Sequence, residues 1–285
     1  YEKSRENIVI FCKEADKIYT KIKAYDKSEN MKAISYSLAL TLSQEYAWKY
    51  YHTKNKKYLK NSKKYIDRNL KLKNSKKYLW YYFSALKSLS IINRADLNFQ
   101  ESIKNHKLIL ELLKCESEQV DEKLCYEEQT NFAVLLMDSG TAENNEKSFN
   151  ILMKVLKNEN ERNYDADNRR AVRVALHAYY MSKFNFEEAE KYISDSIQYI
   201  NTLDLRGKED YYAVLDRLYT LHVHLGYGYE AIKSMEKAVK DAEKDLGKNH
   251  IIVAGLLNNL LENYLMTIPS QNDAKRVKTK LENIL

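Results

Sequence analysis

The sequence predicts an all-α protein built as a solenoid of helical hairpins, and three observations support this prediction. The 285 residues include one proline and six glycines, too few for the tight turns of a β-rich fold. Apolar residues recur at helical spacing along almost the whole chain. Small residues recur about every 40 positions, which is typical of stacked helical hairpins. Hydrophobic residues make up 44% and charged residues 31%, the balance of a folded chain.

The repeat is defined by one small residue per period, which we call the anchor. In YEAIKSMEKAV, Ala231 is followed by Met235 and Ala238 at i+4 and i+7, on one face of a helix. A small side chain is expected at the anchor because two helices cross closely there. Successive anchors are 40, 46, 41, 42 and 43 residues apart, and the 46-residue step predicts an insertion within 115–124 or a longer helix. The anchors are Ser62, Ser102, Ser148, Ala189, Ala231 and Ala274.

The helices are expected in the following order. A lone helix near residues 4–26 forms a lead-in over 1–30, and the repeats fill 31–285. Each anchor lies in a second helix, called helix B, and a helix A precedes it with apolar residues at i, i+3, i+4 and i+7. About six antiparallel pairs result. The expected A helices are 34–51, 78–93, 128–140, 169–182, 210–226 and 253–266.

This pattern resembles the tetratricopeptide repeat, whose helix B carries two small residues where this chain has Ala231 and Ala238. Tyr219 stands where that family has a small residue, and its closing proline is absent. The linker LGKNH followed by LNNL resembles the kinesin-light-chain type of repeat, with Ile251 in place of proline. The resemblance implies one tetratricopeptide-like domain over 1–285, wound as a right-handed superhelix whose concave face is lined by A helices.

The first residue, the lack of a long apolar run and the cysteines predict the setting of the domain. The chain begins with Tyr1, so we expect it to be a segment of a longer protein. No run of 18 apolar residues is present, which argues against a membrane span. Cys12, Cys115 and Cys125 are odd in number and lack metal-ligand spacing, so we expect reduced thiols in a cytoplasmic protein.

No part of the sequence predicts catalysis, a metal site or a cofactor. His222 and His224 are two residues apart on a predicted helix, so their side chains point to different faces. The segment GYG at 226–228 follows no strand, which favours a turn between helices over a phosphate-binding loop. We therefore predict that the protein is not an enzyme.

One segment is strongly basic. Residues 54–77 hold eleven Lys and Arg but a single acid, Asp67, so the rest of the chain is net negative although the total charge is +7. One interpretation is a patch that binds nucleic acid or an acidic protein; the other is a solvated outer helix of a Lys- and Tyr-rich chain. The patch residues are Lys56, Lys57, Lys60, Lys63 and Lys64.

The resemblance places a protein- or peptide-binding groove on the A helices. Asn259 and Asn263 are four residues apart, so their carboxamides are expected to stack on one face and pair with a peptide backbone. The alternative is that one of them pairs within its own helix. The predicted groove residues are Tyr51, Lys87, Arg94, Met181, Asp216, Thr220, Asn259, Asn263 and Met266.

These observations predict a non-catalytic domain that recognises a protein or peptide in its groove. Its setting is expected to be the sensor or adaptor part of a larger signalling protein, such as a bacterial signalling or antiviral ATPase. A scaffold or cargo adaptor is a further setting. The alternatives are a receptor for a short signalling peptide that regulates transcription, and a binder of nucleic acid or acidic partners through residues 54–77.

Overall fold

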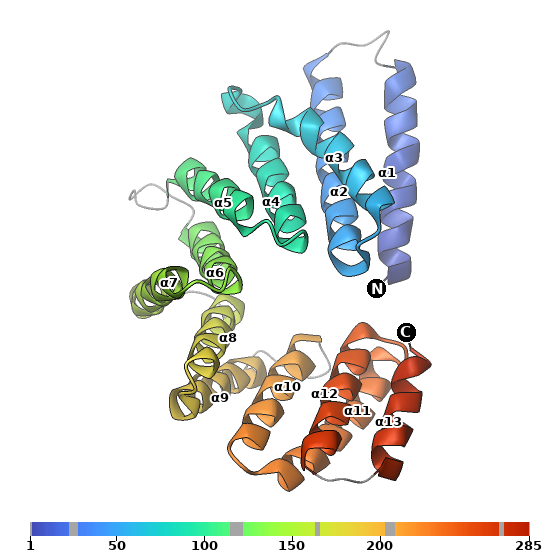
Figure 1. The fold of residues 1–285 in the computed structure, drawn as a ribbon. Helices are drawn as coiled ribbons and strands as arrows, with labels where there is room; N and C mark the ends of the chain where they lie inside the picture. The colour runs from blue at the N-terminus through green and yellow to red at the C-terminus, as the bar shows by residue number, and fades with distance from the viewer. Residues whose placement is uncertain are drawn as a thin grey trace. The chain divides into compact units, whose positions relative to one another are not determined.

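The chain folds into helices joined by short connections (Figure 1). The structure is a computed structural model that describes residues 2–22, 28–114, 122–162, 166–202, 209–267 and 271–284. The described residues contain no strand, so the all-α prediction is confirmed. The α-helices are α1 (Glu2–Ile22), α2 (Glu29–Thr53), α3 (Lys56–Leu70), α4 (Leu79–Ala95), α5 (Phe99–Leu113), α6 (Glu122–Asp138), α7 (Ala142–Arg162), α8 (Ala166–Ser182), α9 (Phe186–Thr202), α10 (Glu209–His224), α11 (Gly228–Leu246), α12 (Ile251–Thr267) and α13 (Gln271–Glu282), with a short 3₁₀ helix η1 (Lys76–Tyr78) before α4.

The helices follow the predicted order of one lead-in helix and six pairs. Helix α1 is the lead-in, the even-numbered helices α2 to α12 are the A helices, and the odd-numbered helices α3 to α13 are the B helices. Every anchor lies in a B helix, as the repeat predicted. The described part of the chain has no helix that is long and apolar enough to cross a membrane.

The chain forms two compact units, Tyr1–Asn144 and Asn145–Leu285. In the N-terminal unit, α2 packs against both α3 and α4, and Ala47, Ile66 and Ile92 form part of the core between them. In the C-terminal unit, α12 packs against α10, α11 and α13 around residues that include Met235 and Leu257. Each unit therefore builds its core from helices that are close neighbours along the chain.

The anchors are buried, which explains why the repeat requires small residues there. Ser62, Ser102 and Ala189 have no exposed surface at all. The Ser62 hydroxyl donates to the backbone carbonyl of Ser43 at 2.8 Å, and the Ser102 hydroxyl donates to that of Ser90 at 2.9 Å. Such contacts with the backbone of helix A require a side chain no larger than serine, because a bulkier one would separate the helices.

Three of the described turns between A and B helices, α4–α5, α8–α9 and α10–α11, share one backbone geometry. Leu97, Phe184 and Gly226 have φ of 59°, 56° and 90°, in the left-handed region that lets a helix end and the chain reverse. The next amide reaches back to a carbonyl five residues earlier, as Asn98 does to Asn93 at 2.8 Å. The Asn98 side chain then accepts from the Glu101 amide and caps α5. The GYG segment is the equivalent turn between α10 and α11, as predicted.

The linker before α12 explains the local resemblance to kinesin-light-chain repeats. Gly247 has φ of 93°, which ends α11, and Ile251 begins α12. The Ile252 amide donates to Nδ1 of His250 at 3.2 Å. His250 therefore caps α12, and the linker can do without proline at Ile251.

The cysteines differ from the expectation. Cys12 is free. Burial is the larger of the two effects that raise the pKa of its thiol, and the charge of Glu45 is the smaller. Cys125 is buried and disulfide-bonded, so the prediction of reduced thiols is wrong at this residue. Cys115 lies outside the described residues, as does most of the segment 115–124 in which we expected an insertion.

Enlarging an anchor is expected to destabilise the C-terminal unit. Ala231 is 1% exposed, so Ala231→Leu must push α10 and α11 apart and should lower the free energy of unfolding by about 1–3 kcal/mol. Urea unfolding followed by circular dichroism measures this change. Ala142→Leu, at an exposed position, is the control and should change stability by less than about 0.5 kcal/mol. Equal effects of the two substitutions would contradict the role of the anchor.

Candidate functional site

The nine predicted groove residues all lie on A helices, but they divide between the two units. Tyr51 on α2 and Lys87 and Arg94 on α4 belong to the N-terminal unit. The others belong to the C-terminal unit and lie on α8, α10 and α12. Each group therefore has to be judged within its own unit.

The C-terminal unit brings Asp216 and Asn259 together. Nδ2 of Asn259 on α12 donates to Oδ2 of Asp216 on α10 at 2.6 Å, and both residues are partly exposed. The hydrogen bond fixes the Asn259 carboxamide and uses only one of its two N–H groups. The amide thus retains one donor and its carbonyl oxygen in a defined orientation.

Asp216 is an unusual carboxylate. Burial raises its pKa to about 6, against the lowering effects of the Asn259 hydrogen bond and the Arg217 charge. Its second oxygen, Oδ1, is buried and has no hydrogen-bond partner among the described residues. The ionised form is therefore poorly compensated at neutral pH.

Asn263 does not share the exposed position of Asn259. Its side chain is 5% exposed, and Nδ2 contacts the sulfur of Met235 on α11 at 3.0 Å. Four residues advance a helix by slightly more than one turn, about 40°, which turns Asn263 towards α11. The expected stack of two accessible carboxamides is therefore not what the structure shows, and Asn263 pairs with a neighbouring helix instead of with its own.

The remaining residues of this group differ in accessibility. Met266 at the end of α12 is 72% exposed, next to Leu265, which is 68% exposed. The Thr220 hydroxyl donates to the Asp216 backbone carbonyl within α10. Met181 is half-buried against the cluster formed by α9 and α10. Met266 is thus the accessible apolar side chain among the predicted residues of this unit.

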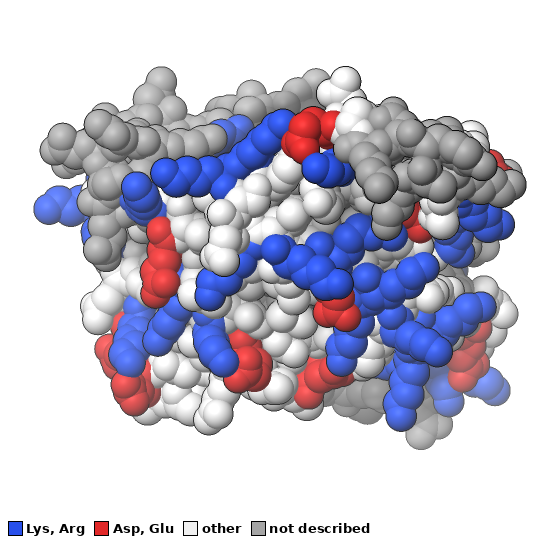
Figure 2. All heavy atoms as spheres, turned by 90° about the horizontal axis from the view of Figure 1, so that it is seen from above, with Lys and Arg blue, Asp and Glu red and all other residues white. Residues whose placement is uncertain are grey.

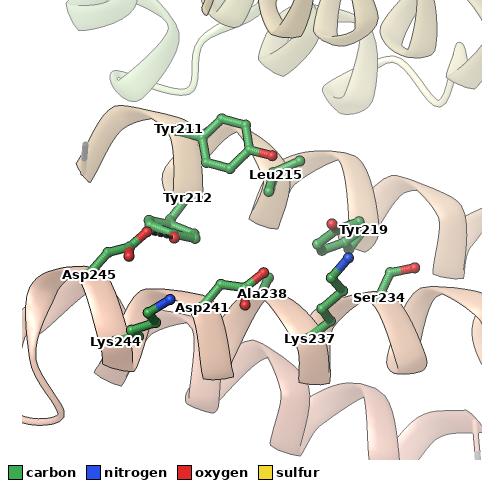
Figure 3. A pocket seen from close by; sticks show the side chains of 10 residues that line it. All are labelled: Tyr211, Tyr212, Leu215, Tyr219, Ser234, Lys237, Ala238, Asp241, Lys244 and Asp245. Atoms are coloured by element: carbon green, nitrogen blue, oxygen red, sulfur yellow. Dashed lines mark hydrogen bonds between the residues drawn. The ribbon is translucent and has the colours of Figure 1, made fainter. Parts of the chain in front are cut away.

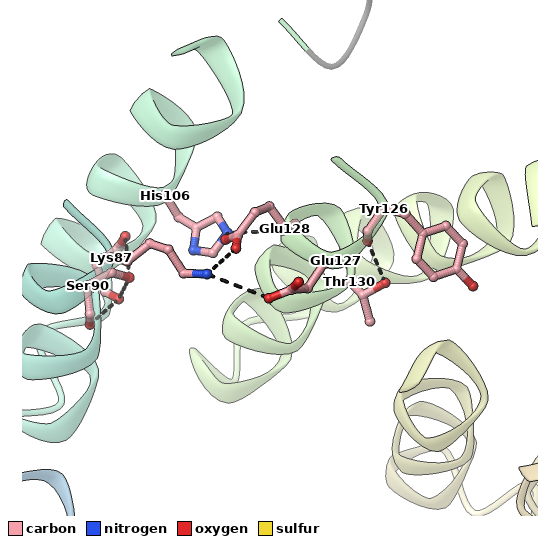
Figure 4. Close-up of polar contacts among 8 residues, drawn as sticks. Lys87, Ser90, His106, Tyr126, Glu127, Glu128 and Thr130 are labelled. Atoms are coloured by element: carbon pink, nitrogen blue, oxygen red, sulfur yellow. Dashed lines mark hydrogen bonds and ion pairs between the residues drawn. The ribbon is translucent and has the colours of Figure 1, made fainter. Parts of the chain in front are cut away.

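In the N-terminal unit, Lys87 is held by carboxylates (Figure 4). Its ammonium lies 2.5 Å from Glu128 and 3.6 Å from Glu127, both on α6. Glu128 is fully buried; burial raises its pKa, but His106 and Lys87 outweigh this and leave it lowered. His106 lies 3.3 Å from the same carboxylate and stacks on Phe132. Lys87 therefore links α4 to α6, and the sequence pattern gave no indication of this network.

Arg94 and Tyr51 also have partners within the unit. Arg94 forms an ion pair with Asp138 on α6, and burial raises the pKa of that carboxyl group. Tyr51 is 37% exposed, and the Lys54 ammonium lies 5.3 Å from the centre of its ring. Two of the three predicted groove residues of this unit thus form links between A helices.

The basic patch lies on α3, as its sequence suggested. Lys56, Lys57, Lys60, Lys63 and Lys64 are all exposed. The ammonium groups of the first four have no partner among the described residues, whereas that of Lys64 lies over the Tyr65 ring. Figure 2 shows one face of the molecule on which Lys and Arg side chains gather with acidic side chains among them.

His222 and His224 lie on α10 and contact different partners. His222 lies 3.5 Å from Glu190, and His224 stacks on Phe186. The two rings contact different partners, as their spacing predicted. Among the described residues there is no cluster of three or more metal-ligand side chains.

Comparison with known proteins identifies the fold. No family model matches the chain, and no curated protein matches its sequence. The crystal structure of BtubC (BKLC) from P. vanneervenii matches with a TM-score of 0.62 and 15% identity over 77% of this chain and 87% of that one. Two structures of the nearly identical TPR-like repeats of a putative kinesin light chain from Podosopora anserina match with TM-scores of 0.57 and 0.56 and identities of 16% and 15%, over 70% of this chain and 92% and 93% of theirs. The chain thus has the fold of a tetratricopeptide-like solenoid, which confirms the resemblance predicted from the sequence.

The raised pKa of Asp216 predicts a pH-dependent stability. The folded state holds the Asp216 proton more tightly than the unfolded state does. Asp216 therefore has little destabilising effect at low pH, where it is protonated in both states. Its destabilising effect grows as pH rises from about 4 to above 6. Asp216→Asn should therefore stabilise the protein at pH 7.5 by about 1–2 kcal/mol, with a smaller gain at pH 4.5. Urea unfolding at the two pH values measures the difference.

The exposed Asp67 supplies the control for this experiment. Asp67→Asn should give the same change in stability at both pH values, within about 0.5 kcal/mol. A gain for Asp216→Asn that is equal at pH 4.5 and 7.5 would show that the buried charge is not its cause.

Proposed function

We propose that this domain recognises a protein or peptide with the exposed face of α10 and α12 in its C-terminal unit, and that it performs no chemistry of its own. The observation that supports this most strongly is the Asn259 carboxamide held by Asp216 at 2.6 Å between two A helices. An amide fixed in this way has lost its rotational freedom before a partner binds, which lowers the entropic cost of binding.

The free groups of Asn259 match a peptide backbone. Its remaining N–H donates and its carbonyl oxygen accepts, while an extended backbone offers one acceptor and one donor per residue. The amide would set the register of the bound segment. Asp216 is a positioning residue in this proposal, since its accessible oxygen already accepts from Asn259.

Met266 supplies the apolar contact. It is 72% exposed on the same helix as Asn259, and its flexible thioether side chain adapts to different apolar surfaces. Burying it against a partner would contribute about 1–3 kcal/mol. A fixed amide and an adaptable apolar side chain on one helix are the elements of a recognition surface with few strong contacts.

The wider role that we propose is that of the sensor or adaptor segment of a larger cytoplasmic signalling protein. The solenoid fold supports a recognition role, since stacked repeats build extended surfaces for binding. Recognition without chemistry suits a segment that reports the presence of a partner to another domain.

Asn259→Ala is expected to weaken partner binding about tenfold, because it removes the oriented amide and leaves Asp216 without its donor. Partners captured from native lysate by the wild-type chain would be identified by mass spectrometry, and their affinities for both chains measured by calorimetry. Asn258→Ala is the matched control, since Asn258 is the adjacent, exposed residue and its amide donates to Glu262 within α12, its one side-chain partner in the described part of the chain. Met266→Asp should weaken binding as well.

The affinities of these variants for captured partners test the proposal in two ways. Equal affinity of wild type, Asn259→Ala and Met266→Asp for every captured partner would place recognition elsewhere on the chain. Loss of binding in Asn258→Ala to the same extent would show that the effect is not specific to the oriented amide.

A second candidate function rests on the exposed lysines of α3. Lys56, Lys57, Lys60 and Lys63 have no partners for their ammonium groups among the described residues, so their charges are available to a polyanion such as nucleic acid or an acidic protein. Binding by this surface alone would depend steeply on salt.

Replacing Lys56, Lys60 and Lys63 by glutamate tests this second function. Affinity for a single-stranded oligonucleotide, measured by fluorescence anisotropy, should fall at least about tenfold and lose most of its salt dependence. The matched control replaces Lys275, Lys278 and Lys280 on α13 and should leave affinity unchanged. Salt-independent or absent binding by the wild-type chain would remove nucleic acid as a partner of the patch.

A further inference from the structure

A pocket of about 480 Å³ lies between α10 and α11 in the C-terminal unit (Figure 3). One wall comes from α10 and consists of Tyr211, Tyr212, Leu215 and Tyr219. The other wall comes from α11 and carries the charged residues Lys237, Asp241, Lys244 and Asp245, together with Ser234 and Ala238. The pocket therefore has an aromatic side and a charged side.

The pocket is separate from the surface proposed to bind a partner peptide. Tyr211, Leu215 and Tyr219 follow one another at four-residue spacing and share one face of α10. Asp216 and Thr220 each lie one position further along, which places them about 100° around the helix. None of Asp216, Asn259 and Met266 lines the pocket, although Tyr212 lies one helical turn before Asp216.

The charges on the α11 wall are unevenly engaged. The Asp245 carboxylate accepts a hydrogen bond from the Tyr212 hydroxyl at 2.5 Å. Asp241 has no ion pair or hydrogen bond to any described side chain, and Figure 3 shows its carboxylate directed into the space between the helices. Lys237 and Lys244 are exposed on either side of it, and their flexible stems let the ammonium groups remain in water.

Two tyrosines of the pocket have hydroxyl groups with raised pKa values. Burial, together with the charges of Tyr211 and Asp241, raises the pKa of Tyr219 to about 12. Burial, the hydrogen bond to Asp245 and the charges of Asp245 and Asp241 also raise the pKa of Tyr212. Both hydroxyls therefore stay protonated at neutral pH.

We propose that this pocket binds the guanidinium group of an arginine side chain from a peptide or protein partner. A guanidinium is planar and weakly hydrated, so it stacks on a tyrosine ring and presents its edge to a carboxylate. The pocket offers both, with Tyr211 and Tyr219 on one side and Asp241 on the other. Lys237 and Lys244 are placed to donate to the backbone carbonyls that flank the arginine.

The composition of the pocket disfavours other small groups. An alkyl ammonium would meet Asp241 but would lose the stacking that a planar cation gains. A phosphate would meet the lysines but, unlike a guanidinium, would not stack on the tyrosine rings. A neutral planar group would stack on the tyrosines without neutralising Asp241.

Titration of the full chain with three blocked amino acids tests the proposal. N-acetyl-arginine methylamide should shift the tyrosine resonances of the wild-type chain in NMR spectra. The lysine and citrulline analogues, which lack the planar shape and the charge respectively, should bind at least about tenfold more weakly. Asp241→Asn should weaken arginine binding about tenfold or more. Glu230→Gln, an exposed change in the first turn of the same helix, should have no effect.

Several results would overturn the proposal. If the citrulline analogue bound as tightly as the arginine analogue, stacking alone would account for binding; if the lysine analogue did so, charge alone would. If inorganic phosphate bound more tightly than the arginine analogue, the pocket would be assigned to anions. Failure of all probes to shift the spectrum would show that the pocket does not take a guanidinium. Because Asp241 is exposed, thermal unfolding of Asp241→Asn should match the wild type, which ensures that a loss of binding is not a loss of folding.

Discussion

The close crossing of two helices at each anchor is the constraint on which the rest of the structure depends. The fully buried Ser62 and Ser102 hydrogen-bond directly to backbone carbonyls of the preceding A helix. This contact joins α3 to α2 and α5 to α4, and it leaves the opposite side of each of these A helices for other contacts. Because the same crossing recurs every 40 to 46 residues, the A helices within each unit follow one another with their corresponding faces presented alike. The functional candidates of the molecule lie on those faces or on surfaces set by them.

The two units use their A helices differently. In the N-terminal unit, Lys87 and Arg94 form ion pairs with carboxylates of α6, so the charges neutralise one another between neighbouring helices. In the C-terminal unit, the corresponding link is the neutral amide of Asn259 bonded to Asp216. A satisfied ion pair rigidifies the contact but offers a partner little, whereas a fixed amide still has groups to share. The same helical framework thus gives two surfaces of different chemical character.

The sequence predicted the architecture well because the relevant signals are local. Small anchors, apolar periodicity and the glycine turn at 226–228 depend on neighbouring residues of the same repeat, and the six pairs follow from them. The chemistry of the site depends on which residue of the next repeat lies opposite. The pairing of Asp216 with Asn259, 43 residues away, and of Lys87 with Glu128, 41 residues away, follows from how two repeats stack. Asn263 illustrates the limit: its spacing from Asn259 is that of a shared face, yet the proximity of α11 buries it. The pocket between α10 and α11 also escaped prediction, since its two walls come from different helices.

The chemical nature of the anchors changes along the chain, from serine in the first three repeats to alanine in the last three. Serine hydroxyls hold the crossing by directed hydrogen bonds, whereas alanine methyl groups hold it by removing apolar surface from water. The second kind of contact loses strength as water is cooled, because the hydrophobic effect near room temperature is largely entropic. Cooling is therefore expected to weaken the alanine contacts at the last three anchors more than the serine hydrogen bonds at Ser62 and Ser102. Cooling thus acts on the two kinds of crossing differently, although both hold the same kind of helical pair.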